Sequence, residues 1–414
     1  MVDNQQRTTS VMPSVERIQQ ELARASSIDD FFGKDGIFAR LFADTLEQML
    51  EAELTAHLGY PRHAKEGRNS GNSRNGKRPR NLRTSSGDTT IQVPRDRTRS
   101  FQSPLLSAYQ TSTNELEDKI IALYGKGMSA RDIQDTLHEA YGVEVSPTTI
   151  STVTDKVWAL VEAWQNRPLA AIYPIVYFSA IHLKLRRDGK VVTTAVYIVL
   201  GVDLDGQRDV VGHWIGAGAE AATFWLSVVT DLLARGVQDS FIACSDGLNG
   251  FTDAILAVFA RAQIQRCIIH QVRQSLSYVA WKDRKTFTAD LPTIYQAPTP
   301  EAASFRLLEL AERWGDIYPI AVRSWESNWE DLATMFEYGA EIGRLIYTTT
   351  SIEGNNRQLR KVTKTKGAFP TDEAARKLLF LVNRDITKKW TAPVPNWAGI
   401  PNQLAIRFAG RFPM

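Results

Sequence analysis

The stretch PIVYFSAIHLKLR–RDGK–VVTTAVYIVLGVD, residues 174–203, decides the fold. Apolar and polar residues alternate through both of its outer segments, and β-branched residues are frequent, a pattern that predicts two β-strands. The four residues RDGK between them predict the turn of a β-hairpin. The chain therefore contains an antiparallel sheet that begins near residue 174.

The sequence after this hairpin predicts three more strands separated by helices. Strands are expected in RDVVGHWIG (208–216), SFIACSD (240–246) and IQRCII (264–269), and helices at 220–236 and at about 249–260. Three hairpin-linked strands followed by alternating helices and strands is the order of a ribonuclease-H-like α/β domain. We place its first part at 169–270, although a fold alone does not fix a function.

The remainder of this core is expected at the far end of the chain. Residues 271–345 read as a helical insertion and carry Trp281, Trp314, Trp325 and Trp329. These rings either form a helical core or stack on a displaced base. Residues 346–414 should then supply the last helices of the core and a C-terminal tail.

The residues before the core predict α-helical regions and a basic segment. Residues 1–60 are expected to be helical and to end at Gly59. Residues 61–112 read as a flexible basic arm or linker, because eleven basic side chains between 62 and 99 accompany three acidic ones and many Gly, Ser and Asn residues. The basic stretch ends in a short β-like piece, TTIQVPRD (89–96). The arm is either a solvated linker or a phosphate-binding segment, in which we select Arg74, Lys77, Arg78 and Arg80.

Residues 113–168 predict a helix-turn-helix domain. Three helices are expected, in ELEDKIIALYGKG, SARDIQDTLHEAYG and SPTTISTVTDKVWALVEAWQ. Thr148, Thr149 and Thr152 lie near the start of the third helix, where side chains of a recognition helix contact base edges. The alternative is a small bundle that only packs or dimerises.

Two carboxylates are candidates for a metal-dependent site. Asp246 ends an apolar strand, and Glu353 lies near the start of a predicted helix. Carboxylate oxygens are the ligands that Mg²⁺ prefers. Cys267 and His270 could form half of a zinc site, but two further ligands are not evident, so no zinc is expected and the pair is assigned a supporting role. Basic residues after Glu353 are either a solvated helix face or phosphate contacts; they include Arg357, Arg360 and Lys361.

Many segments, in one order, carry a family resemblance. They include GNSRNG (71–76), VPRDR (93–97), LYGKGMSARDIQ (123–134), DGLNGF (246–251), QRCIIHQVRQSL (265–276), YTTTSIEGNNRQLRKVTK (347–364) and KKWTAPVPNW (388–397). Over nearly its whole length the chain resembles the Mutator-type transposases of bacterial insertion sequences, which are DD(E/D) transposases. The resemblance implies an Asp-Asp-Glu triad that holds two Mg²⁺ ions for phosphodiester cleavage. It assigns Asp246 as the second Asp, Glu353 as the Glu, and Cys267 and His270 as the family's Cys-x-x-His signature.

The chain departs from the family pattern at the first catalytic position. Ser179 stands where the family has Asp, and a neutral hydroxyl is a poor Mg²⁺ ligand. Around Glu353 the sequence is TSIEGNN, whereas the family has NAIESLN. We expect the two-metal site to be under-occupied and the catalysis to be impaired or absent. A deliberate active-site substitution, a decayed copy and a retained DNA-binding protein are the competing explanations.

The sequence thus predicts an insertion-sequence transposase that acts on double-stranded DNA, both element ends and target, as a homodimer or higher homo-oligomer. The alternatives are a catalytically dead DNA-binding homologue or regulator, and a ribonuclease-H-like nuclease unrelated to transposition. With no apolar run long enough to span a bilayer, no secretory signal and only two cysteines, we expect a cytoplasmic protein, associated with the nucleoid when bound to DNA.

Overall fold

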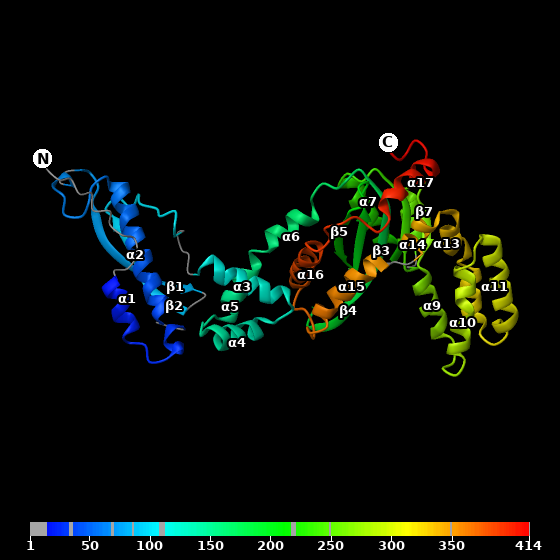
Figure 1. Ribbon diagram of the computed structural model, residues 1–414, viewed down its shortest axis with the longest axis horizontal. Helices are drawn as coiled ribbons and strands as arrows, with labels where there is room; N and C mark the ends of the chain where they lie inside the picture. The colour runs from blue at the N-terminus through cyan, green and yellow to red at the C-terminus, as the bar shows by residue number, and fades with distance from the viewer. Residues whose placement is uncertain are drawn as a thin grey trace. The chain divides into compact units, whose positions relative to one another are not determined.

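The chain folds into two compact units, residues 1–156 and residues 157–414. The structure, a computed structural model, describes residues 15–32, 36–67, 70–84, 87–106, 112–216, 221–247, 250–347 and 350–413. Figure 1 shows the order of helices and strands within each unit. The site residues selected from the sequence are therefore distributed over both units.

The first part of unit 1 is a β-hairpin packed on a long helix. The elements are α1 (Val15–Leu22), η1 (Ile28–Phe31), α2 (Ile37–Leu58), η2 (Lys65–Gly67), β1 (Arg74–Thr84) and β2 (Gly87–Asp96). Leu46 and Leu50 of α2 form a core with Leu82 of β1 and Ile91 of β2. Gly59 ends α2 in the left-handed conformation with φ 78°, as the sequence predicted.

The hairpin corrects the expectation of a flexible arm or linker at 61–112. Strands β1 and β2 pair antiparallel from Lys77 opposite Pro94 to Thr84 opposite Gly87. The Gly-, Asn- and Arg-rich first strand has poor intrinsic β-propensity. It is held because β2 supplies Ile91 and Val93, which pack against α2. Tertiary packing overrides local composition here. Arg68, one of the eleven basic residues, lies outside the described residues.

The second part of unit 1 is a three-helix domain. Its helices are α3 (Asn114–Gly125), α4 (Ala130–Tyr141) and α5 (Pro147–Asp155). Ser129 and Asp132 form a capping box at α4, and Ser146 caps α5 by accepting a hydrogen bond from the Thr149 amide. The expected third helix is shorter than predicted. It ends at Asp155, and α6 (Trp158–Gln165) belongs to unit 2, so the boundary lies before residue 168.

Unit 2 contains a five-stranded mixed sheet in the order β5-β4-β3-β6-β7. The strands are β3 (Ile172–Arg187), β4 (Lys190–Val202), β5 (Arg208–Ile215), β6 (Asp239–Ser245) and β7 (Gln263–Arg266). Strands β3, β4 and β5 are antiparallel neighbours, whereas β6 and β7 run parallel to β3. At the β3–β4 turn, Asp188 and Gly189 both have positive φ, as a two-residue hairpin loop requires.

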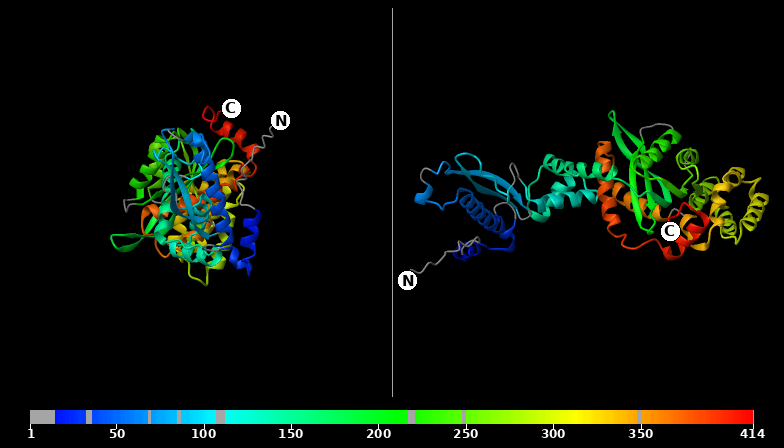
Figure 2. Two further views of the ribbon diagram at one scale, coloured as in Figure 1. Left: turned by 90° about the vertical axis from the view of Figure 1, so that its left-hand side faces the viewer. Right: turned by 90° about the horizontal axis from the view of Figure 1, so that it is seen from above.

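Helices cover both faces of this sheet. On one face α7 (Ala221–Ala234) and α8 (Phe251–Val258) build the core, in which Trp225 packs edge-on against Phe178 and Phe251. On the other face α15 (Thr350–Thr363) contacts β3, and α16 (Asp372–Thr387) contacts β5. The orange and orange-red helices beside the green sheet in Figure 2 are these two. Unit 2 is thus a mixed α/β structure, in which a five-stranded sheet is covered by helices on both faces.

A helical segment separates β7 from α15. It comprises α9 (Ile268–Ser277), α10 (Arg284–Tyr295), α11 (Pro300–Trp314), α12 (Pro319–Glu326), α13 (Trp329–Ala333), η3 (Thr334–Glu337) and α14 (Ala340–Ile346). Trp314 and Trp325 are buried in it, whereas Trp281 is 84% exposed. Among the residues described, no helix has both the length and the hydrophobicity to cross a bilayer.

The chain ends against the sheet. After η4 (Trp397–Gly399) and α17 (Ile400–Arg407), the ring of Phe408 stacks on the buried Phe241 of β6 with centroids 4.8 Å apart. Arg411 forms an ion pair of 2.7 Å with Asp239, the first residue of the same strand. The last residues therefore cover the sheet strand that precedes Asp246.

Candidate functional site

Three elements bring polar side chains together at the end of β6. Register places Phe178 of β3 beside Ser245 of β6, so Ser179 lies next to Asp246. The Ser179 hydroxyl donates to Asp246 Oδ2 at 3.3 Å and accepts from Asn356 Nδ2 of α15 at 2.9 Å. The sequence selected positions 179 and 246, and the structure makes them neighbours.

Glu353 contacts basic side chains of α9. Its Oε1 lies 3.1 Å from Arg273 and 3.6 Å from His270 Nδ1. The start of α9 is fixed because the Cys267 amide donates to the Ser245 carbonyl at 2.8 Å. Cys267 is buried and directly precedes Ile268, the first residue of this helix. The Cys-x-x-His segment therefore directs His270 toward the carboxylate of Glu353.

The local environment shifts the protonation of two of these groups. Burial raises the pKa of Asp246 above its ordinary value, and the nearby His270 and the Ser179 hydroxyl only partly oppose this shift. Burial of the ring lowers the pKa of His270, but hydrogen bonding to Cys267 and the charges of Asp246 and Glu353 outweigh it and leave the pKa raised. The positive form of the imidazole is thus favoured between the two carboxylates.

Arg266 adds a further positive charge near Asp246. Its guanidinium donates to the Gly247 carbonyl at 3.3 Å and to Asn328 at 2.8 Å, and its charge acts on Asp246. Gly247 has φ 85°, and a Cβ there would lie 2.3 Å from this guanidinium. The positive φ favours glycine at this position, and a larger residue would in addition have to displace the end of the Arg266 side chain.

A pair of divalent cations does not fit this side-chain set well. One buried oxygen, Asp246 Oδ1, has no hydrogen-bond partner among the described residues and is open to a cation. However, the described residues contain no group of three or more His, Cys, Asp or Glu side chains suited to hold a metal ion. The second carboxylate, Glu353, is already paired with Arg273 and His270. The positive side chains of Arg273 and His270 thus compensate part of the negative charge that metal ions would neutralise.

One face of α15 continues from Glu353 as a basic stripe. Arg357, Arg360 and Lys361 follow at helical spacing and are exposed, while Ile352, Asn355, Asn356 and Leu359 form the buried face. Residues three and four apart lie on one side of a helix, so the basic side chains lie on the side of Glu353. This stripe is a suitable surface for phosphate groups.

The basic residues selected in the hairpin differ in availability. Arg74 is engaged with Glu51, Thr55 and Tyr60, and Lys77 lies 3.5 Å from Glu47, so both brace the hairpin against α2. Arg80 is half-buried and already interacts with other groups of the protein, so it is less available to a phosphate. Arg78 is exposed, and so are Arg95, Arg97 and Arg99 on and after β2.

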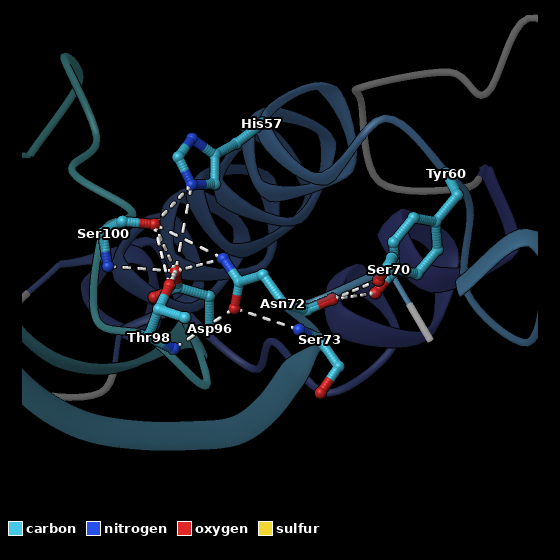
Figure 3. A network of polar contacts seen from close by, with 8 residues as sticks. All are labelled: His57, Tyr60, Ser70, Asn72, Ser73, Asp96, Thr98 and Ser100. Carbon is cyan, nitrogen blue, oxygen red and sulfur yellow. Dashed lines mark hydrogen bonds and ion pairs between the residues drawn. The ribbon is translucent and has the colours of Figure 1, made fainter. Parts of the chain in front are cut away.

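A polar network around Asp96 shapes the segment that carries these last arginines (Figure 3). The Asp96 carboxylate is 1% exposed and accepts hydrogen bonds from Asn72, from Thr98, and from both the amide and hydroxyl of Ser100. His57 of α2 bonds the same Ser100 hydroxyl at 3.0 Å. Burial favours the neutral acid, but these donors outweigh it and hold the pKa of Asp96 well below its ordinary value.

The third helix of the three-helix domain presents hydroxyls to solvent. Thr148 and Thr152 are exposed and one turn apart, whereas Ile150 and Val153 are buried in the domain core. Thr149 is half-buried, and its hydroxyl bonds the capping Ser146 at 2.9 Å. Thr148 and Thr152 are therefore better placed for contacts with a partner than Thr149.

Sequence reasoning missed three residues of the site, namely Arg266, Arg273 and Asn356. The position of Arg273, three residues after His270 on one predicted helix, would have indicated a shared face. Asn356 bonds a residue 177 positions away, and Arg266 at the end of β7 bonds the Gly247 carbonyl, 19 positions away beyond helix α8. Neither contact leaves a local signal in the sequence.

Comparison with known proteins gives consistent results. A family model described as "Transposase, Mutator family" matches residues 14–393. The chain is 42% identical over 385 residues to a probable transposase for insertion sequence element ISRM3-like of Sinorhizobium fredii, covering 92% of this chain and 95% of that protein. The same identity and coverage hold for the transposase for insertion sequence element ISRM3 of Rhizobium meliloti. The transposase for element IS905 of Lactococcus lactis is 34% identical over 89% of this chain and 92% of its own length.

Proposed function

Because this chain belongs to the Mutator family of transposases, we propose that it binds the ends of an insertion sequence through unit 1 and carries a DD(E/D)-type site in unit 2 that is impaired by Ser179. The observation that carries the proposal is the juxtaposition of Ser179 and Asp246 on adjacent strands, with α15 placing Asn356 against Ser179 and Glu353 against α9. Transposases act on DNA, so DNA is the expected partner.

The strand order supports a ribonuclease-H-like core. Three antiparallel strands are followed by two strands parallel to the first, with the sheet order β5-β4-β3-β6-β7. This order agrees with the interpretation of the sequence, and the segment α9–α14 then corresponds to an insertion before the final core helices. Asp246 directly follows β6, at the carboxyl end of the strand, where α/β proteins carry their sites.

The exposed side chains of unit 1 support DNA binding. Arg78, Arg95 and Arg97 of the hairpin region are suited to phosphate contacts, and Thr148 and Thr152 to base contacts from a recognition helix. The neutralisation of phosphates would release counterions and make the affinity depend on salt. Assembly on DNA as a homodimer or higher oligomer is part of this proposal.

Weak or absent cleavage is the second part of the proposal. A triad with two aspartates and a glutamate would offer three negative charges to two Mg²⁺ ions, but here Ser179 offers a hydroxyl that is bonded on both sides. Arg266, His270 and Arg273 further compensate the remaining carboxylates. The same observation favours the second candidate function, a DNA-binding homologue that regulates an active transposase without cutting DNA.

Binding to duplexes that carry the element's own ends tests the first part. Fluorescence anisotropy would be measured between about 50 and 200 mM salt for the wild type and for Arg78→Ala/Arg95→Ala/Arg97→Ala. We expect the slope of log affinity against log salt to decrease by roughly 2–3 in the variant, since each phosphate contact contributes about 0.9. Arg261→Ala/Lys388→Ala/Lys389→Ala removes equal charge from unit 2 and should change the slope less.

Specificity and cleavage complete the test on the same duplexes. Thr148→Ala/Thr152→Ala should reduce the preference for element ends over a scrambled duplex by about 1–3 kcal/mol per lost base contact. Cleavage with Mg²⁺ or Mn²⁺ should be at the background level. Equal binding of ends and scrambled DNA would overturn end recognition, and efficient cleavage by the unmodified chain would overturn the claim of impairment.

A further inference from the structure

Trp281 is the most exposed of the large hydrophobic side chains in the described residues. It lies in the turn between α9 and α10 and is 84% exposed, whereas Trp314 and Trp325 of the same helical segment are 6% and 0% exposed. Leaving a whole indole in water costs free energy that burial would recover. The exposure of this ring in an otherwise well-packed segment therefore indicates a binding surface.

The turn holds this ring in a defined place. Arg284 at the start of α10 lies with its Cζ 5.7 Å from the centre of the Trp281 ring, and its Nε donates to the Val279 carbonyl at 3.0 Å. Val279 is buried and ties the turn to the helical core. A ring supported in this way loses little conformational freedom when a flat partner stacks on its open face.

The surroundings of Trp281 are basic. Lys282 in the turn and Lys285 in the first turn of α10 are exposed, and the ring of Tyr278 is 45% exposed. Arg273, which pairs with Glu353, is an exposed basic residue of α9. The single acid of the turn, Asp283, accepts a hydrogen bond from Tyr318 at 2.6 Å. Basic side chains interleaved with aromatic rings fit a strand of nucleic acid, whose phosphates and bases alternate.

Another exposed apolar surface of the same segment has no excess of positive charge. On α11, Phe305 and Leu308 are 59% and 61% exposed, more than Tyr278. The charged residues of this helix are Glu301, Glu309 and Glu312 together with Arg306, which pairs with Glu309, and Arg313, which pairs with Asp290. A surface of mixed charge attracts phosphates less than a basic one, so exposure alone does not distinguish the two places. The charge assigns the nucleic-acid partner to the α9–α10 turn.

We propose that the α9–α10 turn is a stacking site for unpaired bases of DNA, with Trp281 as the platform. This inference rests on the proposed function. The first two turns of helix α9 carry His270 and Arg273 beside Glu353, and the helix leads away from the sheet toward α10 (Figure 1). At 1.5 Å per residue, His270 and Ser277 are on the order of 10 Å apart along the axis. A single strand that leaves the site can thus follow α9 to the platform.

Two DNA probes separate this site from general DNA binding. One is a blunt 30-base-pair duplex, and the other is the same duplex with a single-stranded 3′ tail of ten thymidines. Their affinities would be measured for the wild type, Trp281→Ala, Trp281→Phe and the matched control Phe305→Ala. Thermal melting would check that each variant is folded. We expect all of them to fold, because both substituted side chains are exposed.

The expected result is a loss confined to the tailed probe. Stacking of one base on an aromatic ring is worth about 5- to 150-fold in affinity, so Trp281→Ala should weaken binding of the tailed duplex by that factor. Its affinity for the blunt duplex should be unchanged, Trp281→Phe should retain most of the tail preference, and Phe305→Ala should match the wild type. 

Two results would overturn the inference while leaving the proposed function intact. One is a wild type that binds blunt and tailed duplexes equally, and the other is Trp281→Ala that loses affinity for both in the same proportion. A wild type that binds neither probe would overturn the proposed DNA-binding function itself.

Discussion

Replacing Ser179 by aspartate should make the protein less stable without metal and responsive to Mg²⁺. The Ser179 hydroxyl is 3.3 Å from Asp246 Oδ2 in a buried site, so Ser179→Asp places a second carboxylate against the first. Two such charges about 4 Å apart repel by roughly 4 kcal/mol at an effective dielectric constant near 20. A charged hydrogen bond from Asn356 returns about 1.5–3 kcal/mol of this.

The net destabilisation is therefore about 1–3 kcal/mol. For a unit of this size that corresponds to a melting temperature roughly 2–10 °C lower in EDTA. Mg²⁺ that binds the restored carboxylates should reverse the loss, since a ligand at one hundred times its Kd stabilises by about 2.7 kcal/mol. The wild type should show little response to Mg²⁺.

Thermal unfolding with EDTA and with saturating MgCl₂ is the assay. Ser179→Asn, which is neutral and similar in size to aspartate, should be destabilised less and should not respond to the metal. Adding Asp246→Asn to Ser179→Asp should abolish the response. A wild type that Mg²⁺ stabilises as much as Ser179→Asp would refute the reasoning, as would a Ser179→Asp protein that is folded but indifferent to Mg²⁺.

Two further predictions concern buried polar side chains. Both atoms of the Asn355 amide are buried without a partner among the described residues, so Asn355→Leu should raise the free energy of unfolding by about 1–3 kcal/mol in urea titrations; a decrease would show that the amide has a stabilising partner. Asp96→Asn should lower the stability of unit 1 at pH 7 by about 2–3 kcal/mol, because it removes the charge that four donors solvate. The folded pKa of Asp96 is depressed, so its contribution is present above the unfolded value near 3.8 and is lost as the pH falls through the folded value. In Asp96→Asn the free energy of unfolding should depend less steeply on pH below about pH 4 than in the wild type. The same pH dependence in both proteins would contradict this assignment.

The sequence predicted the sheet of unit 2 well and the hairpin of unit 1 poorly. Alternation and β-branched residues over 174–203 dictate strands wherever one face is buried, and β3 and β4 appear as predicted. The strand that begins at Arg74 has no such pattern, and its conformation depends on β2 and α2. The fold of this segment is thus encoded in residues outside it.

The same distinction applies to the site. Positions 179, 246 and 353 were selected by strand ends and family resemblance, and all three lie in polar clusters with partners. The partners Asn356 and Arg266 were not predicted, because their contacts depend on how α15 and the turn after β6 pack. Arg74 and Lys77 show that basic composition does not separate phosphate contacts from bracing contacts.

The packing of the C-terminus against β6 has a consequence for synthesis on the ribosome. Phe241 is covered by Phe408, and Asp239 is paired with Arg411, so β6 lacks these partners until residues 408–411 have been translated. At about 5–20 residues per second, they follow β6 by on the order of 10–30 s. Unit 1 is complete as soon as residue 156 has emerged, and it can fold during this interval. A nonsense mutation before residue 408 would then yield a chain with an intact first unit and a second unit in which Phe241 of β6 lacks its cover, so that this strand is exposed to aggregation or proteolysis.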